Sequence, residues 1–491
     1  MGDTSEPWRR DRIFWSLLAL AVALRIAAFD AYAIHHPDES IQYLEQAHRL
    51  VFGYGVVPWE FRYSIRSWLM PLLLAGPMQL GEWIDPGGTF YLVLPRATIA
   101  AMNISPVVAA WFIGARASRQ HAIVAMAVVA IWIESVLFSV QTLSESLAIA
   151  CFLPAVALFR REASATRIAG AGVLMALAGL LRFQFAPAIA VYAVLVAGRD
   201  GRAWRWLVMG GLPVVLFGAA IDMAMGLTPY EWIANNYRMN IVNERMRKIG
   251  GVSYSTYLTD FLEHYNFAGP IVIGLSLMAG RRFRPLLIAA WINIAFHQFI
   301  GHKEWRYLWF SVDILLLLAA IGSVNATRRT IFGRRFARPR SATATAVLIA
   351  AWGIASLGLS MTDLYRFDWR TDGAASRIAA IAARDPRVCG LAVNRYQSTQ
   401  FGYAIVHKRI PVYLLRPDEK PWLSRPGEHA RAFNAVLVNR ILARPTGFPT
   451  RVACGGHGLD AVCLYTRPGG CRSQPDDRPL EHQAQMLAVD M

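Results

Sequence analysis

The residues of the 491-residue chain that could do chemistry gather in three short clusters, and the first contains two adjacent carboxylates. This first cluster consists of His35, His36, Pro37, Asp38, Glu39, Gln42, Glu45 and His48. Gln42, Glu45 and His48 follow the carboxylates at helical spacing. Low dielectric raises the pKa of a carboxylate and a helix start fixes its geometry, so Asp38 or Glu39 could act as a general base. The structural alternative is that Asp38 caps the helix and Glu39 favours its positive end.

Metal binding is a further alternative for this cluster, through His35, His36 and Asp38. Imidazole and carboxylate groups are ordinary metal ligands, but zinc sites usually draw them from pairs at fixed spacing. The sequence offers no His-x-x-x-His pair and no cysteine beside these residues. We therefore predict no metal site and no required cofactor, with a divalent cation as the open alternative.

The second cluster lies further along the same polar stretch and comprises Trp59, Glu60, Arg62, Arg66 and Ser67. The topology argued below places Arg66 on the outer side of a membrane, where arginine is less common. A guanidinium in that position is expected to pair with an anion, either a substrate phosphate or Glu60. An Arg66–Glu60 ion pair with a purely structural role stays open.

The third cluster is a short turn between two apolar segments and comprises Gly301, His302, Lys303, Glu304, Trp305, Arg306 and Tyr307. Charged groups at a membrane edge are costly without partners and are therefore functional candidates. Lys303 and Arg306 could hold a phosphorylated headgroup. His302 could donate a hydrogen bond to it, and Glu304 could orient one of the cations. The alternative is an aromatic-belt anchor with snorkelling cations.

Long apolar segments surround these clusters and must position them. Hydrophobic residues make up 55% of the chain and charged residues 17%, with a mean hydropathy of +0.33, whereas soluble proteins carry about 25% charge. We find eleven windows long enough to cross a bilayer as helices: 13–29, 91–113, 121–139, 145–159, 168–181, 184–197, 206–224, 268–280, 285–300, 306–323 and 342–361. A soluble nucleic-acid-binding protein is thereby excluded, despite a net charge of +17.

The arginines predict the topology of these windows. An N-terminus inside the cell places the arginine groups near residues 116, 160, 199, 282 and 328–340 on the cytoplasmic side, as the positive-inside rule requires. Windows 168–181 and 184–197 must then form a hairpin, because one long helix there would invert everything that follows. All three clusters lie on the outer face in this topology. Only four of the 50 basic residues are lysine, a bias typical of GC-rich bacteria, so we expect the cell inner membrane.

Three parts of the chain are expected from this pattern. Residues 1–365 form a transmembrane domain whose first outer loop spans about 30–90, and residues 476–491 form a disordered tail. Residues 366–475 contain short apolar runs between Pro/Gly turns, typical of strands in a small outer α/β domain: 388–393, 411–414, 435–438 and 461–465. Its cysteines, Cys389, Cys454, Cys463 and Cys471, predict two disulfides in an oxidising compartment, with three connectivities open. Cys151, within a window, is expected to be an inert apolar residue.

Taken together, the clusters resemble one known family, the Alg9-like / GPI mannosyltransferases (glycosyltransferase family 22). The resemblance covers roughly residues 10–365 in motif order and touches the C-terminal part. The motifs that carry it are His36-Pro37-Asp38-Glu39 with Gln42 and Glu45, Trp59-Glu60, Arg66-Ser67 with Pro71, Gln141-Thr142-Leu143-Ser144-Glu145, His302-Lys303-Glu304, Arg306-Tyr307, and 402–413.

This resemblance implies a GT-C membrane fold of about eleven helices, with the N-terminus inside and the C-terminus outside. It implies transfer of a hexose, typically mannose, from a polyprenyl-phosphate sugar to a hydroxyl of a lipid-linked glycan, with inversion at the anomeric carbon. Asp38 would be the general base, with Glu39 beside it. Lys303, His302, Arg306 and Arg66 would bind the donor phosphate, and the residues that orient the substrates would be His36, Trp59, Glu60 and Glu304.

Two other classes of protein compete with this interpretation. A lipid or glycan transporter would also have many spans and buried charges, but it should show paired repeats or helices broken at the membrane midplane, whereas these ionisable groups gather at one face. A scaffold protein would act through its outer α/β domain, and it gives no reason for the His-Pro-Asp-Glu motif. The enzyme is therefore the prediction, and the transporter is its main alternative.

Overall fold

The structure, a computed structural model, folds into two compact units. It describes residues 7–243, 253, 255–329, 342–369, 373–394, 402–415, 430–440, 444–456, 461–473 and 479–482. The helical unit consists of residues 1–29 and 99–366, and the loop–sheet unit consists of residues 30–98 and 367–491. The first long loop thus shares a unit with the C-terminal part. The expected tail from residue 476 lies outside the described residues except for 479–482.

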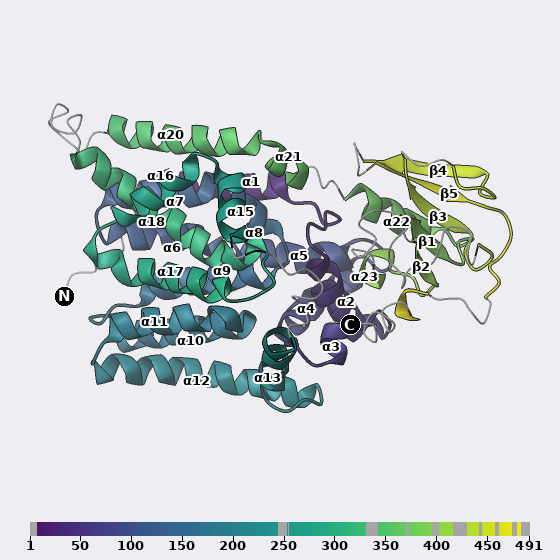
Figure 1. The fold of residues 1–491 in the computed structure, drawn as a ribbon, viewed down its shortest axis with the longest axis horizontal. Helices are drawn as coiled ribbons and strands as arrows, with labels where there is room; N and C mark the ends of the chain where they lie inside the picture. The colour runs from purple at the N-terminus through teal and green to yellow at the C-terminus, as the bar shows by residue number, and fades with distance from the viewer. Residues whose placement is uncertain are drawn as a thin grey trace. The chain divides into compact units, whose positions relative to one another are not determined.

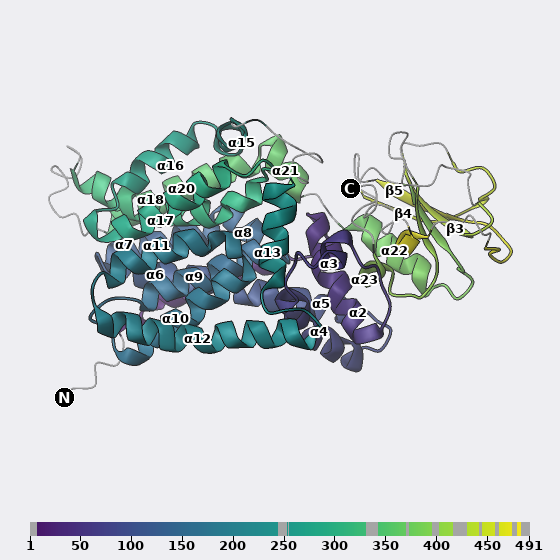
Figure 2. The same cartoon turned by 60° about the horizontal axis from the view of Figure 1, so that its bottom comes forward.

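Long helices run side by side through the helical unit (Figures 1 and 2). Those of its first half are η1 (Pro7–Arg10), α1 (Arg12–Ala28), the end of α5 (Phe90–Met102), α6 (Ser105–Ala115), α7 (Arg119–Ile131), α8 (Ile133–Val140), α9 (Ser144–Leu158), α10 (Ala165–Leu181), η3 (Phe183–Phe185), α11 (Ala186–Ala197) and α12 (Gly201–Ala224). The others are α13 (Glu231–Tyr237), η4 (Arg238–Val242), α15 (Thr256–Tyr265), α16 (Ala268–Leu277), η5 (Arg281–Phe283), α17 (Arg284–Gln298), η6 (Trp305–Leu308), α18 (Trp309–Arg329), α20 (Ala342–Ser360) and α21 (Asp363–Trp369).

All eleven apolar windows are helical. Among the residues that the structure describes, four helical segments are long and apolar enough to cross a membrane: Phe90–Ala115, Gly201–Ala224, Trp305–Arg329 and Ala342–Ser360. The bent pair α7–α8 makes a fifth if it is one span, and shorter apolar helices include α9, α10 and α16. The apolar stretch of η6 and α18 is fully buried and forms the centre of the unit, whereas α12 and α20 expose most of their apolar surface. That exposure is what a lipid-facing helix requires.

The windows 168–181 and 184–197 form a hairpin, as the arginine pattern predicts. α10 ends at Leu181, Arg182 leaves helical geometry, and η3 leads into α11. Arg161, which precedes α10, donates from Nε to the carbonyl of Val196 at the end of α11, at 2.5 Å. The start of one helix and the end of the other are therefore adjacent, as in an antiparallel pair.

One membrane helix is broken, and buried polar side chains satisfy the break. The chain bends by 59° between α7 and α8, at Trp132. The buried Arg25 donates to the carbonyls of Val129 and Ala130 at 3.2 and 2.9 Å. Ser356 donates to the carbonyl of Ile131 and accepts from the N–H of Ile133. A broken helix inside a membrane protein needs such replacement partners for its exposed backbone groups.

The loop–sheet unit contains the helix that the spacing after Asp38 predicts and a small mixed sheet. Its helices are η2 (Glu39–Leu44), α2 (Glu45–Phe52), α3 (Trp59–Arg62), α4 (Leu69–Ile84), the first part of α5, α22 (Ala374–Arg384) and α23 (Tyr403–Val406). η2 has the wide π-helical turn and continues directly into α2. Gly53, at φ +76°, ends α2 in the left-handed conformation that favours glycine.

The sheet has five strands in the order β2-β1-β3-β5-β4: β1 (Leu391–Asn394), β2 (Val412–Leu415), β3 (Ala435–Asn439), β4 (Thr450–Gly455) and β5 (Val462–Thr466). β1 pairs in parallel with β2 and β3, and β5 pairs antiparallel with β3 and β4. The four apolar runs correspond to β1, β2, β3 and β5. β4 is outside those runs because it is a half-exposed edge strand, which carries little apolar signal.

Two disulfides close the C-terminal part. Cys389 pairs with Cys471, and Cys454 pairs with Cys463 across β4 and β5. The sequence predicts two bridges and leaves their connectivity open, and the structure selects this one. Cys151 is buried within α9, as its place in an apolar window predicts.

Candidate active site

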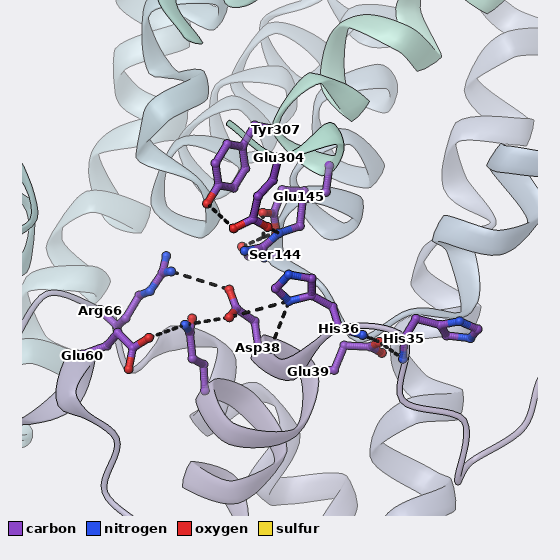
Figure 3. A network of polar contacts seen from close by, with 12 residues as sticks. His35, His36, Asp38, Glu39, Glu60, Arg66, Ser144, Glu145, Glu304 and Tyr307 are labelled. Atoms are coloured by element: carbon purple, nitrogen blue, oxygen red, sulfur yellow. Dashed lines mark hydrogen bonds and ion pairs between the residues drawn. The ribbon is translucent and has the colours of Figure 1, made fainter. Parts of the chain in front are cut away.

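One group of predicted site residues, the loop–sheet unit's half of the predicted set, lies around Asp38, which precedes η2 (Figure 3). Asp38 is buried, and its side chain makes no capping hydrogen bond to the helix that follows. The capping alternative for Asp38 is therefore wrong. The wide turn of η2 is a feature often found at functional sites, because it redirects side chains that a regular α-helix would place elsewhere.

Polar groups of three kinds surround the Asp38 carboxylate. The Gln42 amide donates from Nε2 to Asp38 Oδ1 and to Glu60 Oε1, both at 2.8 Å, and so links two carboxyl groups. A guanidinium nitrogen of Arg66 lies 3.6 Å from Asp38 Oδ2, and Nδ1 of His36 lies 3.6 Å from Oδ1. Four of the predicted site residues therefore meet around Asp38, joined by Gln42.

Glu60 differs from an ordinary surface glutamate. It lies in α3, which begins at Trp59 after Pro58. The pKa of Glu60 is raised to about 7, chiefly by burial and next by the neighbouring Asp38, and Arg66 offsets part of this rise. Glu60 can therefore exchange its proton near neutral pH. Trp59 beside it packs edge-on against Tyr63, with ring centroids 6.5 Å apart.

Glu39 has a different environment from Asp38. Its Oε1 accepts hydrogen bonds from the backbone N–H groups of His35 and His36, at 2.9 and 3.1 Å. Its Oε2 lies 3.2 Å from the guanidinium of the buried Arg96. Both oxygens hold the backbone of the motif in place, so the geometry favours a structural role for Glu39 over the catalytic one that the sequence suggests.

A second group of predicted site residues, the helical unit's half of the predicted set, is centred on Glu304 (Figure 3). His302 Nε2 lies 2.7 Å from Glu304 Oε1, and the Tyr307 hydroxyl donates to the same oxygen at 3.0 Å. Arg306 donates from Nε to Glu304 Oε2 at 2.5 Å. His302 and Glu304 keep 18% and 23% of their side-chain surface exposed, whereas Arg306 keeps 6%. His302 and Glu304 are thus the accessible edge of this half.

Lys303 and Trp305 are held in place by hydrogen bonds and ring contacts to neighbouring groups. The buried Lys303 donates from Nζ to the carbonyl of Ile300 at 2.9 Å, and it lies over the ring of Tyr257 at 5.8 Å. The indole N–H of Trp305 donates to the buried Glu134, and His264 stacks on the indole ring with centroids 4.0 Å apart. The turn is therefore held rigidly on both sides of Glu304.

Three residues of the helical unit's half were not among the predicted site residues. Arg306 Nη1 and Arg182 Nη2 lie 3.2 and 3.3 Å from the same oxygen of the fully buried Glu145. Glu145 and Arg182 appear in the sequence as polar groups within or beside apolar windows, which is the signal that could have found them. Glu134 carries the same signal, an acidic residue inside window 121–139.

The described residues offer no metal site. Within the described ranges, no group of three His, Cys, Asp or Glu side chains has the geometry to hold a metal ion. The alternative of a site from His35, His36 and Asp38 is therefore wrong for this structure. In the helical unit, arginine and lysine side chains supply the positive charge that could stabilise an anion.

Comparison with known sequences shows which protein family the chain matches. Residues 14–363, more than two thirds of the chain, match the model of the Alg9-like mannosyltransferase family. GPI mannosyltransferase 3 of Drosophila melanogaster is 40% identical over 92 residues, 18% of this chain and 16% of that protein. GPI mannosyltransferase 3 of Trypanosoma brucei brucei is 24% identical over 374 residues, 64% of this chain and 66% of that protein. The chain thus matches only part of the length of these relatives.

Comparison with solved structures gives the fold. The crystal structure of ArnT from Cupriavidus metallidurans bound to undecaprenyl phosphate superposes with a TM-score of 0.59 over 94% of this chain and 100% of that chain. The two sequences are 12% identical over this match. The similarity establishes a common GT-C membrane fold with a small C-terminal sheet, as the sequence predicts.

Proposed function

The chain belongs to the Alg9-like mannosyltransferase family, and on that premise we propose that it is a multi-pass membrane glycosyltransferase. It moves a hexose from a polyprenyl-phosphate sugar to a hydroxyl of a lipid-linked glycan or glycolipid. The hexose that we propose is mannose. A polyprenyl tail lies in the bilayer, so a membrane-embedded enzyme can reach such a donor. ArnT, which shares the fold, was solved with undecaprenyl phosphate, a lipid phosphate of this class.

Asp38 is the general base in this proposal, and its environment is the observation that carries it. In-line attack at the anomeric carbon forms the bond from the acceptor oxygen and breaks the bond to the phosphate oxygen, with inversion. Asp38 takes the proton of the acceptor hydroxyl, and the electron pair of the broken bond leaves on the lipid phosphate. The Arg66 guanidinium lies beside the Asp38 carboxylate, and Gln42 fixes the orientation of that carboxylate.

The departing phosphate needs positive charge, and we assign that role to the cluster of the helical unit. His302 is its accessible donor, and Glu304 orients the imidazole. Lys303 and Arg306 supply further positive charge from buried positions beneath this accessible donor. Arginine and lysine can stabilise a departing phosphate electrostatically without a metal ion.

The two disulfides support an outer location for the C-terminal part. Disulfides persist in oxidising compartments and are rare in the cytosol. Both bridges lie after the last apolar window, between Cys389 and Cys471. We therefore propose that the loop–sheet unit faces the periplasmic side of the cell inner membrane, with the active site on that face.

The test uses the purified chain in lipid vesicles. We would supply polyprenyl-phosphate mannose and a lipid-extract acceptor and measure the released lipid phosphate and the mass of the new glycolipid. We expect a product heavier by one hexose, and no product when a nucleotide sugar replaces the lipid donor. The control variant is Asp38→Asn at unchanged thermal stability, which should form product about a thousandfold more slowly. Product formation from the nucleotide sugar alone, or by Asp38→Asn at the native rate, would refute the proposal.

A further inference from the structure

The helix that follows Asp38 is held near its middle by a second acidic residue, Glu45. Glu45 is completely buried at the junction of η2 and α2. Its Oε1 accepts a hydrogen bond from the N–H of Val56 at 2.7 Å, and its Oε2 accepts one from the N–H of Ala404, also at 2.7 Å. Ala404 belongs to α23 in the C-terminal part, 359 residues away in sequence. The carboxylate thus joins α2 to the C-terminal part inside one unit.

A second contact lies one helical turn further along α2. His48 Nε2 lies 3.1 Å from His407 Nδ1, and the ring of His407 stacks on Tyr91 with centroids 3.7 Å apart. The Tyr91 hydroxyl donates to the carbonyl of Ala404 at 3.0 Å. Residues 402–407 therefore contact α2 at two successive turns, which fixes both its position and its rotation about its axis.

The same segment is anchored to the rest of the C-terminal part. Lys408 donates from Nζ to the carbonyls of Asp385 and Val388, at 2.9 and 2.8 Å. These carbonyls lie between the end of α22 and the start of β1. The contacts on α2 are thus carried by a segment that is itself tied to the sheet.

Gly402 makes the contact with Glu45 close. Its backbone is extended, at φ −152° and ψ −178°, a conformation that any residue adopts. A Cβ added there would lie 2.5 Å from Glu45 Oε2 and 2.9 Å from Cδ. The carboxylate would therefore have to move, and it would lose its hydrogen bond to Ala404. Glycine at this position allows the close approach of Glu45. It is not required by the backbone conformation.

We propose that the C-terminal part positions the general base: residues 402–407 fix α2 through Glu45 and His48, and thereby set the orientation of Asp38. Glu45 and Gly402 are positioning residues in this proposal, which rests on the proposed role of Asp38. Asp38 and Glu45 are seven residues apart on one continuous helix, about 10 Å along its axis. A rigid helix transmits a shift at one end to the other. A shift of about 1 Å at a reacting group lowers a rate about a hundredfold.

The experiment compares Gly402→Ala with the matched control Gly470→Ala. Gly470 also lies in the C-terminal part, but a Cβ there would meet nothing within 4 Å. For Gly402→Ala we expect kcat to fall ten- to a hundredfold, with both KM values within twofold of the native chain. Amide exchange of residues 38–52 should rise in Gly402→Ala and stay native in Gly470→Ala. Native kcat and native exchange in a folded Gly402→Ala would overturn the proposal.

Rescue by a shorter carboxylate separates positioning from general damage. Glu45→Asp withdraws the carboxylate by one methylene, which makes room for the added methyl group. The double variant Gly402→Ala/Glu45→Asp should have a kcat at least threefold higher than that of Gly402→Ala. Losses that multiply in the double variant would overturn the proposal. If Gly402→Ala fails to fold, Glu45→Gln replaces it, because its amide NH₂ group opposes a backbone donor; a folded Glu45→Gln with native kcat and exchange would likewise overturn the proposal.

Two readouts keep this inference distinct from the proposed function. Amide exchange needs no substrate and reports how firmly the helix is held, through the opening of its backbone hydrogen bonds. A native chain that transfers no hexose would refute the proposed function, while the exchange data would still decide whether residues 402–407 hold the helix. Transfer that depends on Asp38 but not on Gly402 would refute only the inference.

Discussion

The two groups of predicted site residues, one half in each unit, differ in their charge balance. Around Asp38 in the loop–sheet unit, two carboxyl groups share one guanidinium, that of Arg66, and a neutral amide links them. In the helical unit, three cations (Lys303, Arg182 and Arg306) accompany three carboxylates (Glu134, Glu145 and Glu304), so the formal charges balance. An excess of carboxylates suits proton transfer, whereas a group that contains three cations can stabilise a phosphate. The comparison therefore predicts that variants in the two halves fail in different ways.

The largest expected effect tests the proton-handling half. Asp38→Asn should lower kcat by about a thousandfold, because a general base contributes about 10²–10⁴ to a rate. Glu60→Gln should cost no more than about tenfold, since Glu60 is linked to the base through Gln42 but does not take the acceptor proton. Both are measured as hexose transfer in vesicles. The matched control is Asp385→Asn, which removes a partly exposed carboxylate paired with Arg387.

The reverse ranking would change the assignment within this half. If Glu60→Gln lost a thousandfold and Asp38→Asn only tenfold, Glu60 would be the base and Asp38 its neighbour. The excess of carboxylates would still mark the half as the one that moves protons.

The next effect tests the helical unit's half through its stability. Glu145→Ala should lower the free energy of unfolding by about 3–5 kcal/mol, because it leaves two buried guanidinium groups without their shared carboxylate. Glu304→Gln, at a partly exposed position, should cost less than about 1 kcal/mol. Thermal unfolding in detergent measures both. Equal losses would mean that Glu145 is no more central to the cluster than Glu304.

Local sequence signals predicted much of the fold and one half of the site. Each apolar window became a helix because length and composition decide that outcome without help from the rest of the chain. The positions of Asp38, Gln42 and Glu45 on one helix follow from their spacing in the same way. The hairpin at 168–197 followed from charge, because arginines mark cytoplasmic loops.

Contacts between distant segments were beyond the reach of the sequence. Glu145 meets Arg182 and Arg306 only because α9, the break after α10 and η6 pack together. Glu45 meets Ala404 across 359 residues, and no local signal encodes such a pair. The disulfide connectivity depends in the same way on the strand order. Packing, rather than residue type, decided these features.

A smaller effect sharpens the assignment of the phosphate. His302→Ala should raise the KM for the lipid-phosphate donor about tenfold, or about 1.4 kcal/mol, because it removes the accessible donor of the helical unit's half. The KM for the acceptor should stay within twofold. His482→Ala, at an exposed position in the C-terminal part, is the control. A rise in the acceptor KM instead would move His302 to the acceptor side and blur the division between the halves.

The smallest effect concerns pH and again separates the halves. Burial raises the pKa of Glu60 to about 7 from an ordinary value of 4.5. The folded chain therefore binds the proton more tightly than the unfolded chain, so the stabilisation is complete below about pH 4.5 and is lost as the pH rises through 7. The free energy of unfolding should fall by about 1 kcal/mol from this group between pH 6 and pH 8.

The measurement is thermal unfolding across that pH range in the native chain, in Glu60→Gln and in the exposed control Glu162→Gln. The fall should be smaller in Glu60→Gln, because a neutral amide has no proton to lose, and unchanged in Glu162→Gln. If Glu60→Gln keeps the native slope, Glu60 is ionised throughout this range. The loop–sheet unit's half would then hold two fixed negative charges beside Arg66 and would differ from the helical unit's half only in its charge balance, not in its capacity to exchange protons.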